Sequence, residues 1–117
     1  MKERKCSNPV CPLTQAISVV GGKWKPLIIY QLYNSNKRFG QLHAAVVGIS
    51  RKVLTDQLNE LLRDGLIDRQ EFAETPPRVE YSLTERGRAL QPIFKSMADW
   101  GQFLVKDYKS RLKRKAS

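Results

Sequence analysis

A tight glycine turn between two helical patterns constrains the fold of this chain more than any other feature. Apolar residues over 39–46 fall on one side of a helix, and four leucines over 51–64 recur at the i, i+4, i+7 and i+8 spacing of a second helix. Only Val47-Gly48-Ile49 separates the two patterns, and Ser50 then stands where a helix N-cap is expected. Two helices joined by so short a turn are typical of the helix-turn-helix arrangement.

Two further helices are predicted before this pair. Pro12 stands at a helix-starting position, apolar residues follow it at helical spacing, and Gly21-Gly22 ends the pattern. The stretch 23–34 has Pro26 in its first turn and is apolar nearly all round, so we expect it to be the central buried helix.

A β-hairpin and a long helix are predicted after the pair. Residues 78–83 alternate strictly between apolar and polar, and 66–72 is a weaker partner strand. The tip, 74–77, contains two prolines that supply no N–H to a ladder, which makes it stiff. The chain closes with a helix from an N-cap at Thr84 to about residue 107, and we expect a kink at Pro92.

This order of elements predicts a mainly α fold of the α+β type, a winged helix-turn-helix with a two-stranded β-wing and N- and C-terminal dimerisation helices. A chain of 117 residues fits one compact domain. We expect a flexible basic leader over 1–10, the winged-helix domain over 11–107 and a basic C-terminal tail over 108–117.

The net charge of +10 lies mostly at the two ends of the chain. Residues 1–5 carry +2 and residues 106–117 carry +5, which leaves +3 for the middle. Clustered cations suit a polyanion such as nucleic acid, although basic tails also serve only to keep proteins in solution. No apolar run reaches the roughly 18 residues of a membrane span, and the N-terminus lacks the apolar stretch of a secretory signal. We therefore expect a cytoplasmic protein with no membrane partner.

The outward face of the helix predicted at 51–64 points to duplex DNA. Arg51 and Lys52 stand in its first turn, where the positive end of the helix dipole makes a cation cost a few tenths of a kcal/mol. That cost makes sense if this end meets phosphates or base edges in a major groove. The alternative is an ordinary solvated polar face. Asp56 fits poorly, and we expect it to pair with Lys52 or to accept from a cytosine amino group. The predicted contacts to double-stranded DNA on this helix and the one before it are Lys37, Arg38, Gln41, Ser50, Arg51, Lys52, Thr55 and Asn59.

The hairpin carries one more predicted DNA contact, Arg78. It follows two prolines at the end of a stiff ribbon, from which an arginine can reach into a minor groove. An ordinary surface arginine is the alternative. Glu74 beside it would repel phosphate, so we expect Glu74 to face away.

The last helix carries more aromatic surface than a core of this size needs. Core packing and pairing with a second copy both account for it, and we expect both. A two-fold homodimer would set two reading helices about one turn of DNA apart and match a palindromic operator. The predicted dimer interface comprises Leu13, Ile17, Phe94, Met97, Trp100 and Leu104.

The two cysteines offer a candidate switch. Cys11 precedes Pro12, beside a helix N-terminus that would stabilise a thiolate and raise its reactivity. A small buried residue is the equal alternative, and Cys6 is at most a resolving partner. With His43 as the only histidine, which we expect to be structural, the chain falls short of a zinc set, so we predict no metal and no cofactor. A thiol enzyme would need a base near Cys11, and we expect no enzyme.

Several motifs, in this order, resemble the HxlR-type family of bacterial winged-helix regulators, relatives of the MarR group. The resemblance covers about residues 11 to 101 and implies a homodimer on a palindromic operator, with the helix at 50–63 in the major groove. It also implies that the cysteine matching Cys11 senses oxidants or electrophiles in some members. The motifs are Cys11-Pro12, Gly21-Gly-Lys-Trp-Lys25, Arg38-Phe-Gly-Gln-Leu42, Gly48-Ile-Ser-Arg-Lys-Val-Leu-Thr55, Leu58-Asn-Glu-Leu61, Asp64-Gly-Leu66, Pro76-Pro-Arg-Val-Glu-Tyr-Ser-Leu-Thr-Glu85 and Asp99-Trp-Gly101.

The sequence therefore predicts a sequence-specific DNA-binding regulator of transcription, a repressor switched by modification of Cys11 by a small electrophile or oxidant. The alternative is an architectural or otherwise non-sequence-specific nucleic-acid-binding protein. Single-strand binders stack bases on exposed aromatic side chains. Here the aromatic residues fall mostly on apolar helix faces, which argues against that mode of binding.

Overall fold

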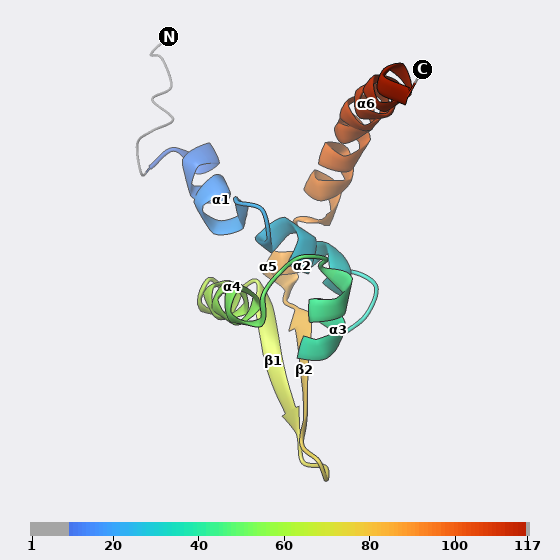
Figure 1. Cartoon of the computed structure of the whole chain (residues 1–117). Coiled ribbons are helices and arrows are strands. Elements are labelled where there is room, and N and C mark those ends of the chain that lie inside the picture. Colours follow the sequence, from blue (N-terminus) through green and yellow to red (C-terminus); the bar gives the residue numbers. More distant parts are fainter. Residues whose placement is uncertain (1–9, 117) are drawn as a thin grey trace.

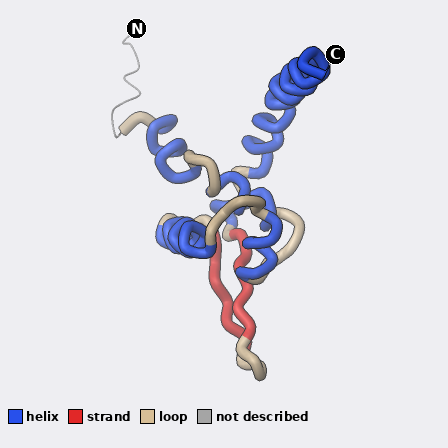
Figure 2. Tube along the Cα trace, viewed as in Figure 1, coloured by secondary structure: helices blue, strands red, loops and turns tan. Residues whose placement is uncertain are grey.

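The computed structural model describes residues 10–116 and confirms a winged helix-turn-helix (Figure 1). Helices α2, α3 and α4 surround the core, the β-hairpin projects from one side, and α1 and α6 project from the other (Figures 1 and 2). The elements are α1 (Pro12–Val20), α2 (Lys25–Leu32), α3 (Phe39–Ala45), α4 (Arg51–Arg63), β1 (Ile67–Phe72), β2 (Arg78–Leu83), α5 (Glu85–Arg88) and α6 (Gln91–Ala116).

One apolar core holds the three central helices together. Helix α4 contributes Leu54, Leu58 and Leu61, three leucines on one face that are almost completely buried. They pack with Ile28 and Ile29 of α2 and with buried side chains of α3 and the wing base. Fully burying a side chain of this size stabilises a fold by about 1.5–3 kcal/mol. This burial fixes which face of α4 points outward.

The two turns that flank α4 need glycine. Gly48, in the turn between α3 and α4, has φ +92°, and Gly65, directly after α4, has φ +76°. Side chains with a Cβ avoid this left-handed region. At Gly65 the arrangement closes α4, because its N–H and that of Leu66 donate to the carbonyls of Leu62 and Leu61, at 3.1 and 3.0 Å.

The wing is an antiparallel hairpin that is tied to the body at its base. Its register pairs Ile67 with Leu83 at the base and Phe72 with Arg78 near the tip. The backbone of Lys37, in the link between α2 and α3, donates to the Tyr81 carbonyl at 3.0 Å and accepts from the Tyr81 N–H at 2.7 Å. This isolated bridge adds the link to the outer edge of β2, so α3 and the wing are held at a fixed distance.

The C-terminal part of the chain corrects a prediction. Thr84 does cap a helix, since its hydroxyl accepts from the Gly87 N–H at 3.2 Å, but that helix is the short α5. The predicted long helix is divided in two instead of being kinked. Helix α5 ends at Arg88, four residues before Pro92, because proline has no N–H and its ring clashes with the carbonyl four residues earlier. Pro92 instead lies in the first turn of α6, where an N–H would lack a partner anyway. Helix α6 runs on to Ala116, well past the predicted end near residue 107.

Helix α2 is shorter and less enclosed than predicted. Its buried side comprises Ile28, Ile29 and Leu32, whereas Leu27 and Tyr30 are exposed, Tyr30 by 60%. A helix of this length packs on the core with one face, and within residues 10–116 no element covers the other face. The prediction of burial all round was therefore wrong.

A buried lysine joins α2 to α4. Lys25, in the first turn of α2, is only 6% exposed, and its Nζ lies 3.5 Å from Oε1 of Glu60. Glu60 is half-exposed, accepts from Nε2 of Gln57 at 3.0 Å and lies 3.9 Å from Nη2 of Arg63. Glu60 thus has other polar partners and contact with solvent, whereas the buried ammonium of Lys25 depends on Glu60.

This asymmetry predicts unequal losses of stability. Glu60→Ala leaves the buried ammonium without its carboxylate and is expected to lower the free energy of unfolding by about 2 kcal/mol. Lys25→Met keeps the apolar stem packed and leaves Glu60 with solvent and Arg63, so its loss is expected to stay below about 1 kcal/mol. Urea unfolding measures both, with Asp56→Ala, which breaks an exposed pair, as the control. Equal losses in the two variants would contradict this account.

Candidate nucleic-acid interface

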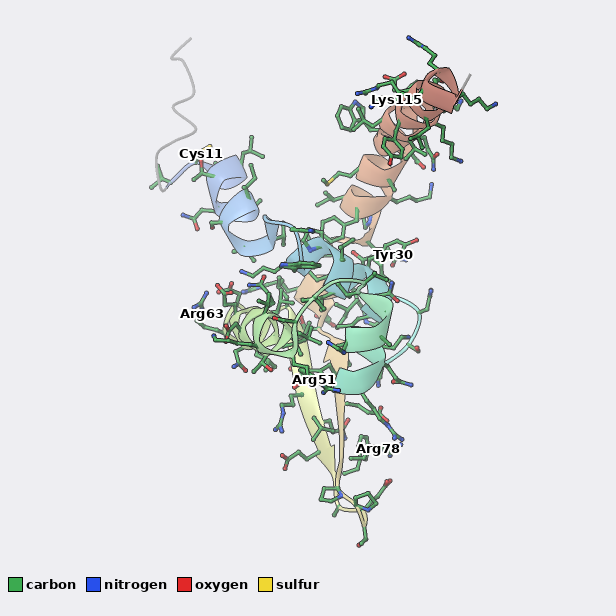
Figure 3. The ribbon with its side chains drawn as sticks, viewed as in Figure 1. Cys11, Tyr30, Arg51, Arg63, Arg78 and Lys115 are labelled. Carbon is green, nitrogen blue, oxygen red and sulfur yellow. The ribbon has the colours of Figure 1, made fainter. Side chains whose placement is uncertain are left out.

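The N-terminus of α4 presents two cations to solvent. Ser50 caps the helix, and its Oγ accepts from the Val53 N–H at 3.1 Å. Arg51 and Lys52 follow in the first turn and are exposed. The first turn contains no acidic residue, so these cations face the positive end of the helix dipole uncompensated by an acid in that turn. Figure 3 shows Arg51 on the side of the body from which the wing projects, with Arg78 further along the wing.

Helix α3 supports the arginine at this end. The guanidinium carbon of Arg51 lies 5.9 Å from the centre of the Phe39 ring, within range of a cation–π contact. His43, one turn further along α3, lies parallel to Phe39 with ring centres 6.4 Å apart. Sequence reasoning placed Phe39 on the apolar side of its helix and missed this contact, because a helical pattern does not reveal which ring a neighbouring helix meets.

The rest of the outward face of α4 is polar and loosely paired. Lys52 Nζ lies 3.0 Å from Oδ2 of Asp56, the first of the two partners predicted for Asp56. Because Lys52 is 85% exposed, this pair contributes little and a phosphate could replace Asp56. The Thr55 hydroxyl donates to the Arg51 carbonyl at 2.9 Å, and Asn59 is exposed one turn further along.

The start of α3 holds three more of the predicted contacts. Gln41 caps the helix, since its Oε1 accepts from the Arg38 N–H at 2.8 Å. The side chains of Arg38 and Gln41 are exposed, whereas Lys37 is half-buried and its ammonium donates to Ser35 Oγ. The backbone bridge of Lys37 to the wing gives that residue a structural role that sequence reasoning did not predict.

Arg78, in the wing, forms ion pairs with two glutamates. Nη2 of Arg78 lies 3.0 Å from Oε1 of Glu74, Nη1 lies 3.1 Å from Oε2 of Glu80, and the guanidinium covers the Phe72 ring at 4.1 Å. Sequence reasoning did not predict these contacts. The register explains two of them, because Phe72 is the cross-strand partner of Arg78 and Glu80 lies two residues along the same strand, so all three share one face.

A second wing arginine went unnoticed in the sequence. Arg69, on β1, stands opposite Tyr81, and its Nη1 lies 3.0 Å from Oε1 of Glu71. Hydrogen bonds to Tyr81 and then to Glu71 raise the pKa of Arg69, which keeps it charged. Sequence reasoning missed Arg69 because it alternates with acidic residues along β1, and that strand lacks a clean apolar–polar pattern.

These elements form one continuous surface, which we call the α3–α4–wing face: the start of α3 (37–41), the outward face of α4 (50–59) and the wing tip (74–79). A cleft of about 380 Å³ lies between Arg38, Phe39 and Gly40 on one side and residues 74–79 on the other. Arg38 and Arg78 line the same cleft, and Phe39 contacts Arg51 as well. The structure thus brings together predicted residues from all three elements.

The other predicted residues lie on the opposite side of the body, on α1 and α6 (Figure 3). Leu13, Ile17, Met97, Trp100 and Leu104 are exposed, Trp100 by 66%. Phe94 differs from the other predicted interface residues, since it is 9% exposed and belongs to the core of the chain.

The two cysteines were predicted as a candidate switch. Cys11 is the half-buried N-cap residue of α1. Cys6 lies outside the described residues.

Residues 10–116 contain neither a cluster of metal-binding side chains nor a membrane-spanning helix. In this stretch no group of three His, Cys, Asp or Glu side chains is placed to hold a metal ion. None of its helices combines the length and the apolar character needed to cross a bilayer.

Comparison with known proteins gives a consistent result. The sequence profile of the HxlR-like helix-turn-helix family matches residues 19–109. The HTH-type transcriptional regulator YdeP of Bacillus subtilis (strain 168) is 43% identical over 102 residues, which cover 87% of this chain and 77% of YdeP. A structure assigned to the MarR family of transcriptional regulators, from Porphyromonas gingivalis W83, superposes with a TM-score of 0.79 at 42% identity and covers 85% of this chain and 97% of that one. The redox regulator HypR in its reduced form superposes with a TM-score of 0.78 at 39% identity and covers 85% and 98%.

The cap of α4 can be tested without DNA. Ser50→Ala removes the acceptor of the Val53 N–H and is expected to lower the free energy of unfolding by about 1 kcal/mol, the usual value of an N-cap. Ser50→Asn restores an acceptor and is the matched control. Urea unfolding of both variants is the measurement, and equal stability of Ser50→Ala and the native chain would refute the capping role.

Proposed function

Because the chain belongs to the HxlR-like helix-turn-helix family of transcriptional regulators, we propose that it binds duplex DNA sequence-specifically as a homodimer, on a palindromic operator, and represses transcription. The observation that carries this proposal is the pair of exposed cations, Arg51 and Lys52, at the capped N-terminus of α4. A helix shaped only for stability would place acids there. In a major groove the same end meets phosphates and base edges, which repay the cost.

The reading contacts are proposed for each part of the α3–α4–wing face. Arg51 takes a base edge, held over Phe39 so that little rotamer freedom is lost on binding. Lys52 exchanges its partner Asp56 for a phosphate of the DNA, and Arg38 approaches the DNA backbone next to that phosphate. The further proposed contacts on this face are Lys37, Gln41, Ser50, Thr55 and Asn59.

Arg78 contributes less in this proposal than the sequence suggested. Its two carboxylate partners offset its charge, and it is only 28% exposed. Contact with a minor groove requires its guanidinium to leave Glu74, the partner at the wing tip. The wing therefore supplies a conditional contact, whereas the cations of α4 are already presented.

The homodimer is supported by the apolar surface on α1 and α6. Met97, Trp100 and Leu104 recur on α6 at heptad-like spacing, and Leu13 and Ile17 lie on α1. Large apolar residues that gather on one side of a protein mark an interaction surface. A two-fold pairing through these helices leaves both α3–α4–wing faces free and sets two copies of α4 against successive major grooves.

Substitutions on the α3–α4–wing face rank these contacts. An operator is first selected from a pool of random duplexes. Arg51→Ala is expected to weaken binding to it by about tenfold or more, the value of one base-reading arginine. Arg78→Ala is expected to weaken it less, and Glu74→Gln is expected to strengthen it, because that change removes a negative charge and releases the guanidinium. Titration of labelled operator at fixed salt measures the three affinities.

Controls separate the loss of contacts to DNA bases from effects on folding and on total charge. Lys95→Ala removes an exposed cation of α6, on the other side of the body, and should leave affinity unchanged. If neither arginine substitution alters binding, the interface lies elsewhere. Selection of no preferred duplex, with similar affinity for all, would favour the architectural alternative.

We also propose that Cys11 is the switch, acted on by a small electrophile or oxidant. The thiolate adds to an electrophilic C=C bond and forms an S–C bond at the residue before α1, while the π bond opens and its other carbon takes a proton from water. Cys11 occupies the N-cap position of α1, which carries part of the proposed dimer surface, so an adduct there would change how the two copies of α4 are spaced. Support comes from HypR, a similar protein that is described as a redox regulator and was solved in reduced and oxidised forms.

Removal of the thiol tests this switch. Cys11→Ser is expected to retain operator affinity and to lose any response to N-ethylmaleimide or diamide, since serine forms neither adduct nor disulfide. Binding to labelled operator with and without reagent is the measurement, and Cys6→Ser is the matched control. A full response in Cys11→Ser would move the switch to another group.

A further inference from the structure

Positive charge gathers at the far end of α6. Residues 106–115 carry six lysines and arginines and a single acid, Asp107, so this short segment holds +5 of the net charge of +10. All of its side chains are exposed. Four of the six cations lie past residue 109, where the match to the family profile ends. The proposed function makes no use of this charge.

The helix dipole accounts for only part of the charge. Cations in the last turn of a helix are favoured by its negative end, and Lys113, Arg114 and Lys115 stand there. This effect falls off within one turn, so it does not explain Lys106 or Lys109. Those two lysines need another reason.

Three lysines form one row along α6. Lys106, Lys109 and Lys113 follow one another at spacings of three and four residues, which places them on one side of the helix, and we call this row the lysine stripe. No acidic residue stands three or four positions before or after any of them. Like charges at this spacing destabilise a helix unless an anion lies between them. The stripe therefore suits an anionic partner.

Two kinds of anionic partner fit the stripe poorly. Protein interfaces are depleted in lysine and enriched in arginine and aromatic residues. A lipid surface needs a broad apolar face beside the cations. Here the large apolar side chains are Val105, Tyr108 and Leu112, and the last two continue the four-residue spacing from Leu104 of the proposed dimer surface. A second copy paired along that line would cover them and leave the lysines exposed, which favours nucleic acid as the partner.

The lysine stripe lies far from the α3–α4–wing face. Phe94 packs in the core, and Lys109 is fifteen residues further along α6, about 22 Å of helix. The end of α6 and the wing point away from each other (Figure 1). Lys115 lies at the opposite end of the molecule from Arg51 and Arg78 (Figure 3). A two-fold axis that sets two α4 helices on one duplex passes through that duplex, so both stripes stay on its far side.

One duplex does not serve both surfaces. To pass from the α3–α4–wing face to the end of α6, it would have to reverse its direction within the length of the molecule. Bending a duplex through less than a right angle over two or three helical turns already costs free energy, and a reversal costs far more. A second duplex segment meets the stripe without bending.

We propose that the lysine stripe binds the phosphate backbone of a second DNA duplex. The stripe is about 10 Å long, and over that length a duplex presents about six phosphate charges. Lysine binds phosphate as a point charge and does not read bases, so a segment of any sequence suffices. A dimer on its operator would thus hold two segments together. That consequence rests on the proposed function, whereas the affinity of the stripe for a duplex does not.

Recruitment of a second duplex tests the proposal. A selected operator is fixed to beads and saturated with the full chain, and a labelled duplex that lacks the operator is added. The native chain is expected to retain the labelled duplex. A triple substitution is expected to retain about tenfold less while binding the operator as the native chain does, since glutamine preserves the helix and removes the charge. The substitutions are Lys106→Gln, Lys109→Gln and Lys113→Gln.

The matched control removes as many exposed cations from other helices and loops. It should retain the labelled duplex as the native chain does, because the stripe is intact and only the total charge has changed. Its substitutions are Lys23→Gln, Arg88→Gln and Lys95→Gln.

A second measurement needs no operator. Arg51→Ala with Lys52→Ala removes the cations at the start of α4, and the remaining affinity for a duplex of random sequence is measured against salt concentration. Adding the three stripe substitutions is expected to lower the slope of log affinity against log salt by about 3 for each stripe that contacts the duplex, which is about 0.9 for each lost phosphate contact.

Three results would overturn the proposal. These are equal recruitment by the stripe variant and the native chain, an unchanged salt slope, and stripe-dependent binding to phosphatidylserine vesicles or to polyglutamate with no recruitment of duplex. A chain whose salt slope falls as expected but which selects no operator would support the stripe and contradict the proposed function alone.

Discussion

The burial of one face of α4 is the constraint on which the rest of this structure depends. Leu54, Leu58 and Leu61 pack against α2 and α3, and truncating any one of them to alanine costs about 2–5 kcal/mol, a large part of the stability of a small domain. Rotation of α4 about its axis would expose all three leucines. The outward positions of Arg51 and Lys52 therefore follow from the burial of the leucines on the opposite face of α4.

Electrostatics then divides the cations of the α3–α4–wing face into two kinds. On α4 they are exposed and weakly paired, so desolvation on contact with DNA costs little. In the wing, Arg78 has two carboxylate partners and an aromatic ring beneath it, so a phosphate must compete with contacts that already exist. The same contrast holds between the two ends of the molecule: the end that carries the α3–α4–wing face is polar, whereas α1 and α6 leave large apolar side chains exposed.

The sequence was sufficient for the winged helix-turn-helix fold, because leucine spacing, glycine turns and capping residues are local signals. Ser50, Gly48 and Gly65 were correctly located for this reason. It failed at Pro92, where a proline in a long helical pattern is equally compatible with a kink and with the start of a new helix. It also missed the contacts of Arg78 and Lys25, since these depend on cross-strand register and on the meeting of two helices, which no single segment encodes.

The central claim is that the N-termini of two α4 helices read the major groove of one operator. Interference by methylation of guanine N7, an atom that lies in the major groove, tests it most directly on a selected duplex. The account predicts that methylation blocks binding in two short segments whose centres lie about one helical turn apart, related by two-fold symmetry. Binding that tolerates N7 methylation at every guanine, or interference confined to one segment, would contradict it.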